Sequence, residues 1–287
     1  MTNRYDRRDI LKGAGAICAT NLLWVASNTA PQQNLQVADR DVEVQLSPVS
    51  PHTFRLSVLP IEGGQPQPLK SNGSLVQASW GAPLAKFKGG ENERVVKSGQ
   101  LNIKLSRSPL RAMVENAKGE VVQHVTIDSE SGAVSFLLGN SALLALGEGG
   151  PQFDRRGSTD AMRSGQGGYQ LHTHGGRVPI PWLIGTAGWA LYFHQPFGTF
   201  DFTGNEGKFL AKDPGSALPL DIFVVASQEP KELMAEYATL TGHPEAPRNQ
   251  RLRWFRAPRS KRIAQRAGRA DLPQTFGAAL SPAAVFV

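Results

Sequence analysis

The chain has 287 residues and one cysteine, Cys18, so no disulfide can form within it. Its formal net charge is +7, but residues 248–287 contribute +8 and residues 1–30 contribute +2, which leaves −3 for residues 31–247. Because the central part of the chain is mildly acidic, the basic overall balance does not indicate a nucleic-acid partner, and none is expected.

The first segment has the features of a twin-arginine export signal. Arg7 and Arg8 precede a modestly apolar stretch, residues 13–26, that is too short to cross a bilayer of roughly 30 Å as a helix. Residues 1–27 are therefore predicted to be a removable signal peptide, with no stable membrane anchor. The predicted destination is the periplasm or the exterior of a bacterial cell. Two other interpretations stay open: an amphipathic N-terminal helix and a lipoprotein signal at Cys18.

Short alternating runs separated by Gly, Pro, Asn and Ser clusters dominate residues 41–225, and this pattern is typical of an antiparallel sandwich. One run, Val121–Ile127, is weaker because Gln123 interrupts its apolar face. Another, Leu220–Ala226, is apolar apart from Asp221 and is predicted to lie in the middle of a sheet. Three further runs have period two with apolar residues on one face: Val42–Leu46, Phe54–Val58 and Leu101–Leu105.

One helix is predicted, starting at Ser227. Ser227 is expected to cap it, Glu229 to complement the positive end of its dipole, and Pro230 to be tolerated in its first turn. Gly242 is expected to end the helix in a left-handed conformation. The predicted buried stripe consists of Leu233, Met234, Tyr237 and Leu240.

The loop of residues 147–176 combines many polar side chains with nine glycines. Glycine at this density lets the backbone approach a ligand closely, which indicates a functional loop rather than a simple connection. His172 and His174 would share one face of a strand, but two imidazoles without a third ligand do not make a metal site, and no metal is predicted. Trp182 and Trp189 stand in apolar runs and are expected in the core.

Six motifs in the second half of the chain occur in an order and spacing that resemble a known family. They are Ala145–Gly150, Phe153–Gly157, Val178–Trp182, Gly188–Tyr192, Glu229–Leu233 and Tyr237–Gly242. Together they resemble the N-terminal β-sandwich of glycoside hydrolase family 31, the retaining α-glucosidases and α-xylosidases. The resemblance implies an all-β fold, a large antiparallel β-sandwich of the galactose-mutarotase-like type with one C-terminal helix, over residues 40–247.

The resemblance also implies which residues contact substrate. In the family, the loop equivalent to 147–176 lines the mouth of the catalytic pocket, and the positions here matched to that role are Gln152, Phe153, Asp154, Asp160 and Arg163. Both catalytic aspartates of the family belong to a (β/α)8 barrel that follows the sandwich, and such a barrel needs roughly 250 residues. We therefore predict no catalytic residue and no cofactor in this chain, which is expected to be inactive alone.

Residues 248–287 form an arginine-rich tail in which periodicity is lost just where the family pattern would open the barrel. Three explanations are open: a frameshift after Pro247, a disordered basic tail, and a new helical appendage. The expected function is that of the non-catalytic N-terminal domain of an exported family 31 α-glycosidase. Its expected partners are an α-linked oligosaccharide or glycoside and a catalytic barrel on a separate chain. The alternatives are a stand-alone carbohydrate-binding module and a mutarotase-like sugar epimerase.

Overall fold

A computed structural model describes residues 34–163, 177–195, 197–212 and 216–243 of the chain. The predicted signal peptide, the tail after residue 247, and His172 and His174 lie outside these residues. Within the described ranges, no helix is both long enough and apolar enough to span a membrane.

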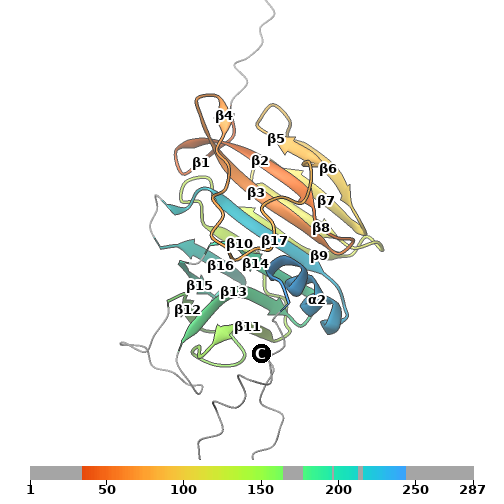
Figure 1. Ribbon diagram of the computed structural model, residues 1–287, viewed down its shortest axis with the longest axis vertical. Helices are drawn as coiled ribbons and strands as arrows, with labels where there is room; N and C mark the ends of the chain where they lie inside the picture. Colours follow the sequence, from red (N-terminus) through yellow and green to blue (C-terminus); the bar gives the residue numbers. More distant parts are fainter. Residues whose placement is uncertain (1–33, 164–176, 196, 213–215, 244–287) are drawn as a thin grey trace, which may run out of the picture. The chain divides into compact units, whose positions relative to one another are not determined.

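Two antiparallel sheets make up the described part of the chain, which confirms the predicted β-sandwich (Figure 1). One described sheet has nine strands, in the order β1 (Gln36–Val37), β2 (Arg40–Pro48), β3 (Thr53–Glu62), β17 (Leu220–Ala226), β14 (Trp189–Phe193), β13 (Val178–Gly185) and β11 (Leu143–Glu148), with β4 (Gln65–Pro66) on β3 and β5 (Ala85–Phe87) on β2. The other has eight, in the order β12 (Thr159–Ala161), β15 (Gly198–Asp201), β16 (Glu206–Ala211), β10 (Val134–Leu137), β9 (Val121–Ile127), β8 (Leu110–Glu115), β7 (Leu101–Ser106) and β6 (Glu93–Ser98).

The main core lies between the two sheets and follows from the period of two in the strands. Along β7, for example, Leu101, Ile103 and Leu105 are buried while the residues between them are only partly buried. Aromatic rings fill the centre of this core with edge, tilted and stacked contacts at centroid distances of 4.6–6.5 Å. The rings come from both sheets: Phe136, Phe193, Phe200, Phe202 and Phe209.

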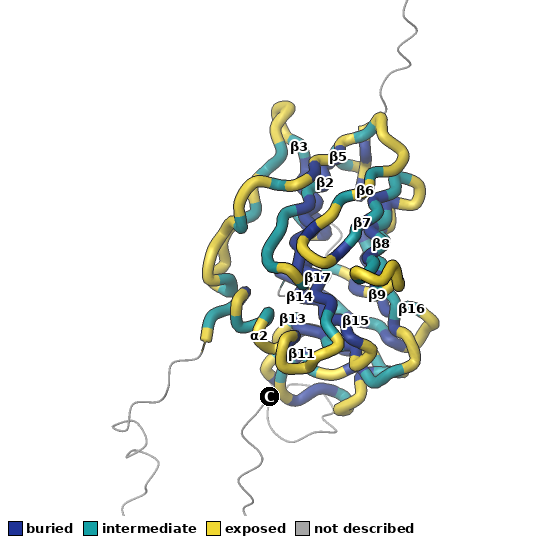
Figure 2. The backbone as a smooth tube through the Cα atoms, turned by 90° about the vertical axis from the view of Figure 1, so that its right-hand side faces the viewer, coloured by how far each residue is buried: buried dark blue, intermediate teal, exposed yellow. Residues whose placement is uncertain are grey.

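A second, smaller core lies on the face of the nine-stranded sheet that points away from the eight-stranded sheet, and we call this the outer face. Helix α2 (Pro230–Thr241) lies across it near β14 and β17 and buries Leu233 and Leu240 against it (Figure 1). Because β17 is covered on both faces, every one of its residues is buried, and its central place in the sheet is confirmed (Figure 2). Trp182 and Trp189 are both buried, as predicted.

The helix differs from the prediction in three details. Glu229, not Ser227, occupies the N-cap position, although the Ser227 hydroxyl accepts a hydrogen bond from the Glu229 backbone N–H at 3.0 Å. Met234 is 47% exposed, because the apolar surface that α2 covers is too narrow to reach it. Gly242 has φ +91° and ψ 160°, so it ends the helix with a positive φ but not in the left-handed helical conformation.

Gln123 does not interrupt the buried face of β9. Its side chain is fully buried, because Oε1 accepts a hydrogen bond from Leu137 N at 2.7 Å and Nε2 donates to Leu137 O at 3.1 Å. The amide therefore satisfies the backbone of the last residue of β10, where the β9–β10 ladder has ended. Val121, the first residue of this run, is 50% exposed at the end of the strand.

Candidate functional site

The segment after β11, residues 149–163, contains all five positions that the sequence matched to substrate contact, and we call it the loop lobe. Figure 1 shows it at the β11 end of the nine-stranded sheet. Arg156 anchors it, since its guanidinium donates to Gly139 O at 2.9 Å and also bonds to Ser141 O. Asp154 anchors it a second time, accepting from the backbone N–H of Leu143 at 3.0 Å and of Arg156 at 3.1 Å.

Three of the predicted positions lie together on this anchored lobe. Gln152 is exposed and donates from Nε2 to Arg156 O at 2.8 Å, while Asp154 uses one oxygen to order the backbone. Phe153 stands between them with 80% of its surface exposed. A phenyl ring held out from an ordered loop is available to stack on a ligand or on another protein surface.

The other two predicted positions are placed differently. Asp160, in β12, is fully buried, and both of its oxygens lie 3.0 Å from Nη2 of Arg177. In this arrangement the carboxylate orders the base of the lobe, and a direct contact with substrate would require the pair to open. Arg163 lies at the exposed end of the lobe, where its backbone N–H donates to Ala161 O at 2.8 Å. The substrate-contact role of all five positions stays a prediction.

The base of the lobe includes an irregular turn of β11. Ala145, Leu146 and Gly147 all have positive φ, of +76°, +65° and +82°, and the register with β13 shifts between Ala145 and Gly147. Such a conformation is unfavourable for residues with a Cβ. At Gly147 a Cβ would lie 2.1 Å from Val178 O, so only glycine fits.

Two buried arginines hold this turn. Arg155 donates to Ala145 O from Nε at 3.0 Å and from Nη2 at 2.8 Å, and Arg177 donates from Nη1 to Leu146 O at 2.7 Å and Glu148 O at 3.0 Å. Guanidinium groups are suited to this because each presents several donors in a fixed plane. The motif Ala145–Gly150 that suggested the family resemblance is therefore a structural support for the lobe.

Sequence reasoning missed a second group of polar residues on the outer face, all of them buried except Asn72. Asp221 in β17 forms a bidentate ion pair with Arg55, in which Nε donates to Oδ1 at 2.7 Å and Nη2 donates to Oδ2 at 2.8 Å. Ser57 donates to Oδ1 at 2.9 Å, and Nδ1 of His194 lies 2.9 Å from Oδ2. Nε2 of His194 lies 2.8 Å from Oδ1 of Asn72. We call these five residues the Asp221 network.

Burial alone would raise the pKa of Asp221, but the hydrogen bonds and charges of His194 and Arg55 outweigh it and hold this pKa below its usual value. Arg55 is further held by Ala78 O at 2.8 Å and by the ring of Trp80, whose centroid lies 5.4 Å from the guanidinium carbon. The network thus fixes the segment that contains Asn72, Ala78 and Trp80 over the outer face.

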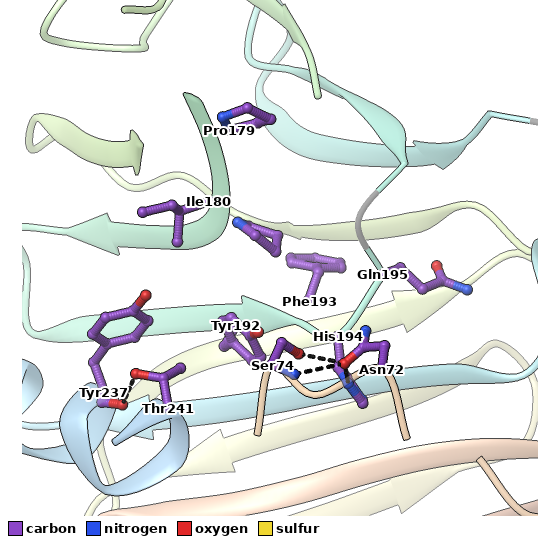
Figure 3. Close-up of a pocket in the computed structure, with 11 residues that line it drawn as sticks. Asn72, Ser74, Pro179, Ile180, Tyr192, Phe193, His194, Gln195, Tyr237 and Thr241 are labelled. Atoms are coloured by element: carbon purple, nitrogen blue, oxygen red, sulfur yellow. Dashed lines mark hydrogen bonds between the residues drawn. The ribbon is translucent and has the colours of Figure 1, made fainter. Parts of the chain in front are cut away.

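A pocket with a cavity volume of about 290 Å³ lies next to this network, and we call it the outer-face pocket. Figure 3 shows the residues that line it, drawn from the segment around Asn72, the start of β13, the end of β14 and helix α2. They are Asn72, Ser74, Pro179, Ile180, Pro181, Tyr192, Phe193, His194, Gln195, Tyr237 and Thr241. Burial raises the pKa of Tyr192 above its usual value. None of the lining residues belongs to the loop lobe.

The fold is that of a β-sandwich similar to part of the glycoside hydrolase family 31 enzymes. No family profile matches the chain, and no curated protein matches it. A family 31 dextranase of Flavobacterium johnsoniae, solved with isomaltotriose, matches 75% of this chain with 29% of its own, at 17% identity and a TM-score of 0.56.

Two other solved structures are similar. The cycloalternan-forming enzyme of Listeria monocytogenes, solved with a pentasaccharide substrate, matches 70% of this chain with 20% of its own, at 16% identity and a TM-score of 0.51. A xylosidase of Aspergillus niger matches 75% of this chain with 33% of its own, at 15% identity and a TM-score of 0.50. The chain thus spans a third or less of each enzyme, and at these identities the similarity establishes the fold.

Proposed function

We propose that this chain is the non-catalytic β-sandwich domain of an exported α-glycosidase of the family 31 type. In this role it binds an α-linked oligosaccharide through the loop lobe and supports a catalytic barrel of that family. The observation that carries the proposal is the two-sheet architecture, which is similar to 20–33% of the length of three carbohydrate-processing enzymes.

The loop lobe supports the substrate-binding part of the proposal. It is anchored by Arg156 and Asp154, and it exposes Phe153 beside the amide of Gln152. An aromatic face next to amide groups is suited to a sugar ring, because the ring offers one apolar face and a rim of hydroxyl groups. Since the lobe is already ordered, little conformational entropy is lost when a ligand binds.

The apolar surface beside α2 supports the second part of the proposal. Side chains of alternate residues in β13, Val178 and Ile180, are 52% and 37% exposed on the outer face, and Leu144 of β11 is 38% exposed on the same face. Met234 of α2 adds a side chain that is 47% exposed. Apolar side chains gathered beside a helix in this way are suited to contact with another domain.

Two measurements on the full chain test this proposal. The chain is expected to show no hydrolysis of 4-nitrophenyl α-D-glucopyranoside or α-D-xylopyranoside above a buffer blank. It is also expected to bind isomaltotriose in calorimetric titration, and Phe153→Ala is expected to weaken that binding by about tenfold, since it removes the exposed ring. Val95→Ala, at a 70% exposed position on β6, is the control and is expected to leave binding unchanged.

The outcomes separate the candidate functions. Turnover that Asp154→Asn abolishes would make the chain an enzyme and contradict the proposal. Binding of isomaltotriose that Phe153→Ala does not weaken would contradict the role of the lobe. Binding as tight as that of a complete enzyme, with no association with any barrel, would instead favour a stand-alone carbohydrate-binding module.

A further inference from the structure

The outer-face pocket has two chemically different walls. Pro179, Ile180 and Pro181 from β13, with the rings of Tyr192 and Tyr237, form an apolar wall. The opposite wall is polar, and it consists of Asn72, Ser74, His194 and Gln195. A ligand that fills such a pocket has one apolar face and one face rich in hydrogen-bonding groups.

The charged residue types absent from the lining of the pocket restrict the ligand further. Among the residues that line it there is no Lys, Arg, Asp or Glu. The one ionisable base, His194, has both ring nitrogens engaged, with Asp221 at 2.9 Å and Asn72 at 2.8 Å. A charged ligand would therefore meet no oppositely charged side chain that still has a hydrogen-bonding atom available. The lining thus favours a neutral ligand.

Asn72 provides a donor whose direction is fixed by its neighbours. The backbone N–H of Ser74 donates to Oδ1 of Asn72 at 3.0 Å, and the Ser74 hydroxyl donates to the same atom at 2.6 Å. Because a backbone N–H can only donate, the atom that faces it is the oxygen, and the amide nitrogen must lie on the other side (Figure 3). Among the described residues, no group accepts a hydrogen bond from this nitrogen.

One more polar group at the pocket has no partner among the described residues. The Tyr237 hydroxyl points away from the axis of α2 toward Ile180 in Figure 3, and no hydrogen bond engages it. A hydroxyl group both donates and accepts, so the pocket combines two donors, on Asn72 and Tyr237, with an acceptor on Tyr237. A ligand with several hydroxyl groups satisfies both kinds.

We propose that the outer-face pocket binds a single neutral pyranose ring, with the apolar face of the ring on Tyr237 and Ile180 and its hydroxyl groups on Asn72. A cavity of about 290 Å³ lies at the lower end of the range for small-ligand sites, which suits one ring and not an oligosaccharide. The choice of a sugar rests in part on the proposed function, but the site is separate from the loop lobe.

Two substitutions test the pocket without removing its framework. Asn72→Asp keeps an oxygen for Ser74 and His194 but replaces the free donor with a charged acceptor. Tyr237→Phe removes only the hydroxyl and keeps the ring contacts with Trp182, at a centroid distance of 5.0 Å, and Tyr192, at 6.2 Å. Both variants are expected to fold, and their thermal midpoints check this.

The experiment is calorimetric or NMR titration of the full chain with methyl α-D-glucopyranoside and methyl α-D-xylopyranoside, with succinate as a charged comparison. We expect a Kd on the order of 1 mM for at least one glycoside, the range of small ligands with few atoms, and no saturable binding of succinate. Asn72→Asp is expected to weaken binding by about tenfold or more, and Tyr237→Phe by roughly two- to tenfold.

Phe153→Ala distinguishes this site from the loop lobe and is expected to leave binding of the methyl glycosides unchanged. If only Phe153→Ala weakens their binding, the sugar occupies the lobe and the pocket proposal is overturned while the proposed function stands. The absence of saturable binding by either glycoside, or binding that both pocket variants leave intact, also overturns it. If the pocket binds glycosides but the lobe variant binds isomaltotriose normally, the proposed role of the lobe fails and the pocket stands.

Discussion

Replacing Asp221 with asparagine is predicted to destabilise the domain strongly. The carboxylate of Asp221 receives two donors on each oxygen: Arg55 Nε and Ser57 Oγ at Oδ1, and Arg55 Nη2 and His194 Nδ1 at Oδ2. An asparagine has one oxygen and one NH2 group, so one of these sites loses its acceptor.

The size of the expected loss of stability depends on which of these donors can become an acceptor instead. Ser57 can turn its hydroxyl to accept, and His194 can give up a proton, but an N–H of Arg55 cannot accept a hydrogen bond. Either orientation of the amide therefore sets an N–H of Arg55 against an NH2 group and leaves the guanidinium without its counter-charge. Breaking a buried ion pair on one side costs about 3–5 kcal/mol, which for a domain of this size lowers the thermal midpoint by roughly 6–20 °C.

The assay is thermal unfolding followed by circular dichroism or calorimetry at neutral pH. Asp128→Asn is the matched control, because Asp128 is exposed and an asparagine keeps the oxygen that accepts from Ser131 N at 2.7 Å. The control is expected to change the free energy of unfolding by no more than about 0.5 kcal/mol. An Asp221→Asn midpoint within about 2 °C of the wild type would refute the reasoning, since it would mean that Arg55 is adequately solvated without its partner.

The same network predicts how stability depends on pH. The pKa of Asp221 in the folded protein lies below the value of about 3.9 in an unfolded chain, because the bonds from His194 and Arg55 outweigh burial. The contribution of this carboxylate is therefore fully present above about pH 4 and is lost as pH falls through the folded-state pKa. In acid, the wild type should lose more stability than Asp221→Asn, which has no proton to take up at this position.

Two further predictions concern the second sheet and the leader. Gln123→Leu removes the amide that satisfies Leu137 N and O and leaves these two partly buried backbone groups without that partner. We therefore expect the free energy of unfolding in chemical denaturation to fall by about 1–3 kcal/mol, whereas Gln152→Leu on the exposed loop lobe should change it little. Equal effects of the two variants would contradict the role of Gln123. Export by the twin-arginine route is expected to stop when Arg7 and Arg8 are both replaced by Lys, because Lys lacks the fixed fork of donors of Arg, and unchanged recovery from the periplasm in cell fractionation would exclude this route.

The strands were predictable because their pattern is local. Leu101, Ile103 and Leu105 alternate with polar residues, because only one face of this strand is buried. The helix was predictable for the same reason, although Met234 was wrong: periodicity gives the direction of the buried face, but the width of that face depends on what the helix covers.

The Asp221 network was not predictable from local pattern, because its members are far apart in sequence. Arg55 and Asp221 are separated by 166 residues, and Asn72 and His194 by 122. One signal was present: Asp221 stands alone in an apolar strand, and a carboxylate in such a place needs a buried partner. Finding that partner required the antiparallel register that sets Asp221 opposite Ser57, next to Arg55.

The irregular turn of β11 has a consequence for self-association. Among the described strands, β11 lies at the end of the nine-stranded sheet, where open carbonyl groups would be a template for another chain. Arg155 and Arg177 already occupy the carbonyls of Ala145, Leu146 and Glu148 with N–H groups of their own. These two side chains block the edge of the sheet, so the domain can hold the loop lobe at this edge without pairing strand by strand with another chain.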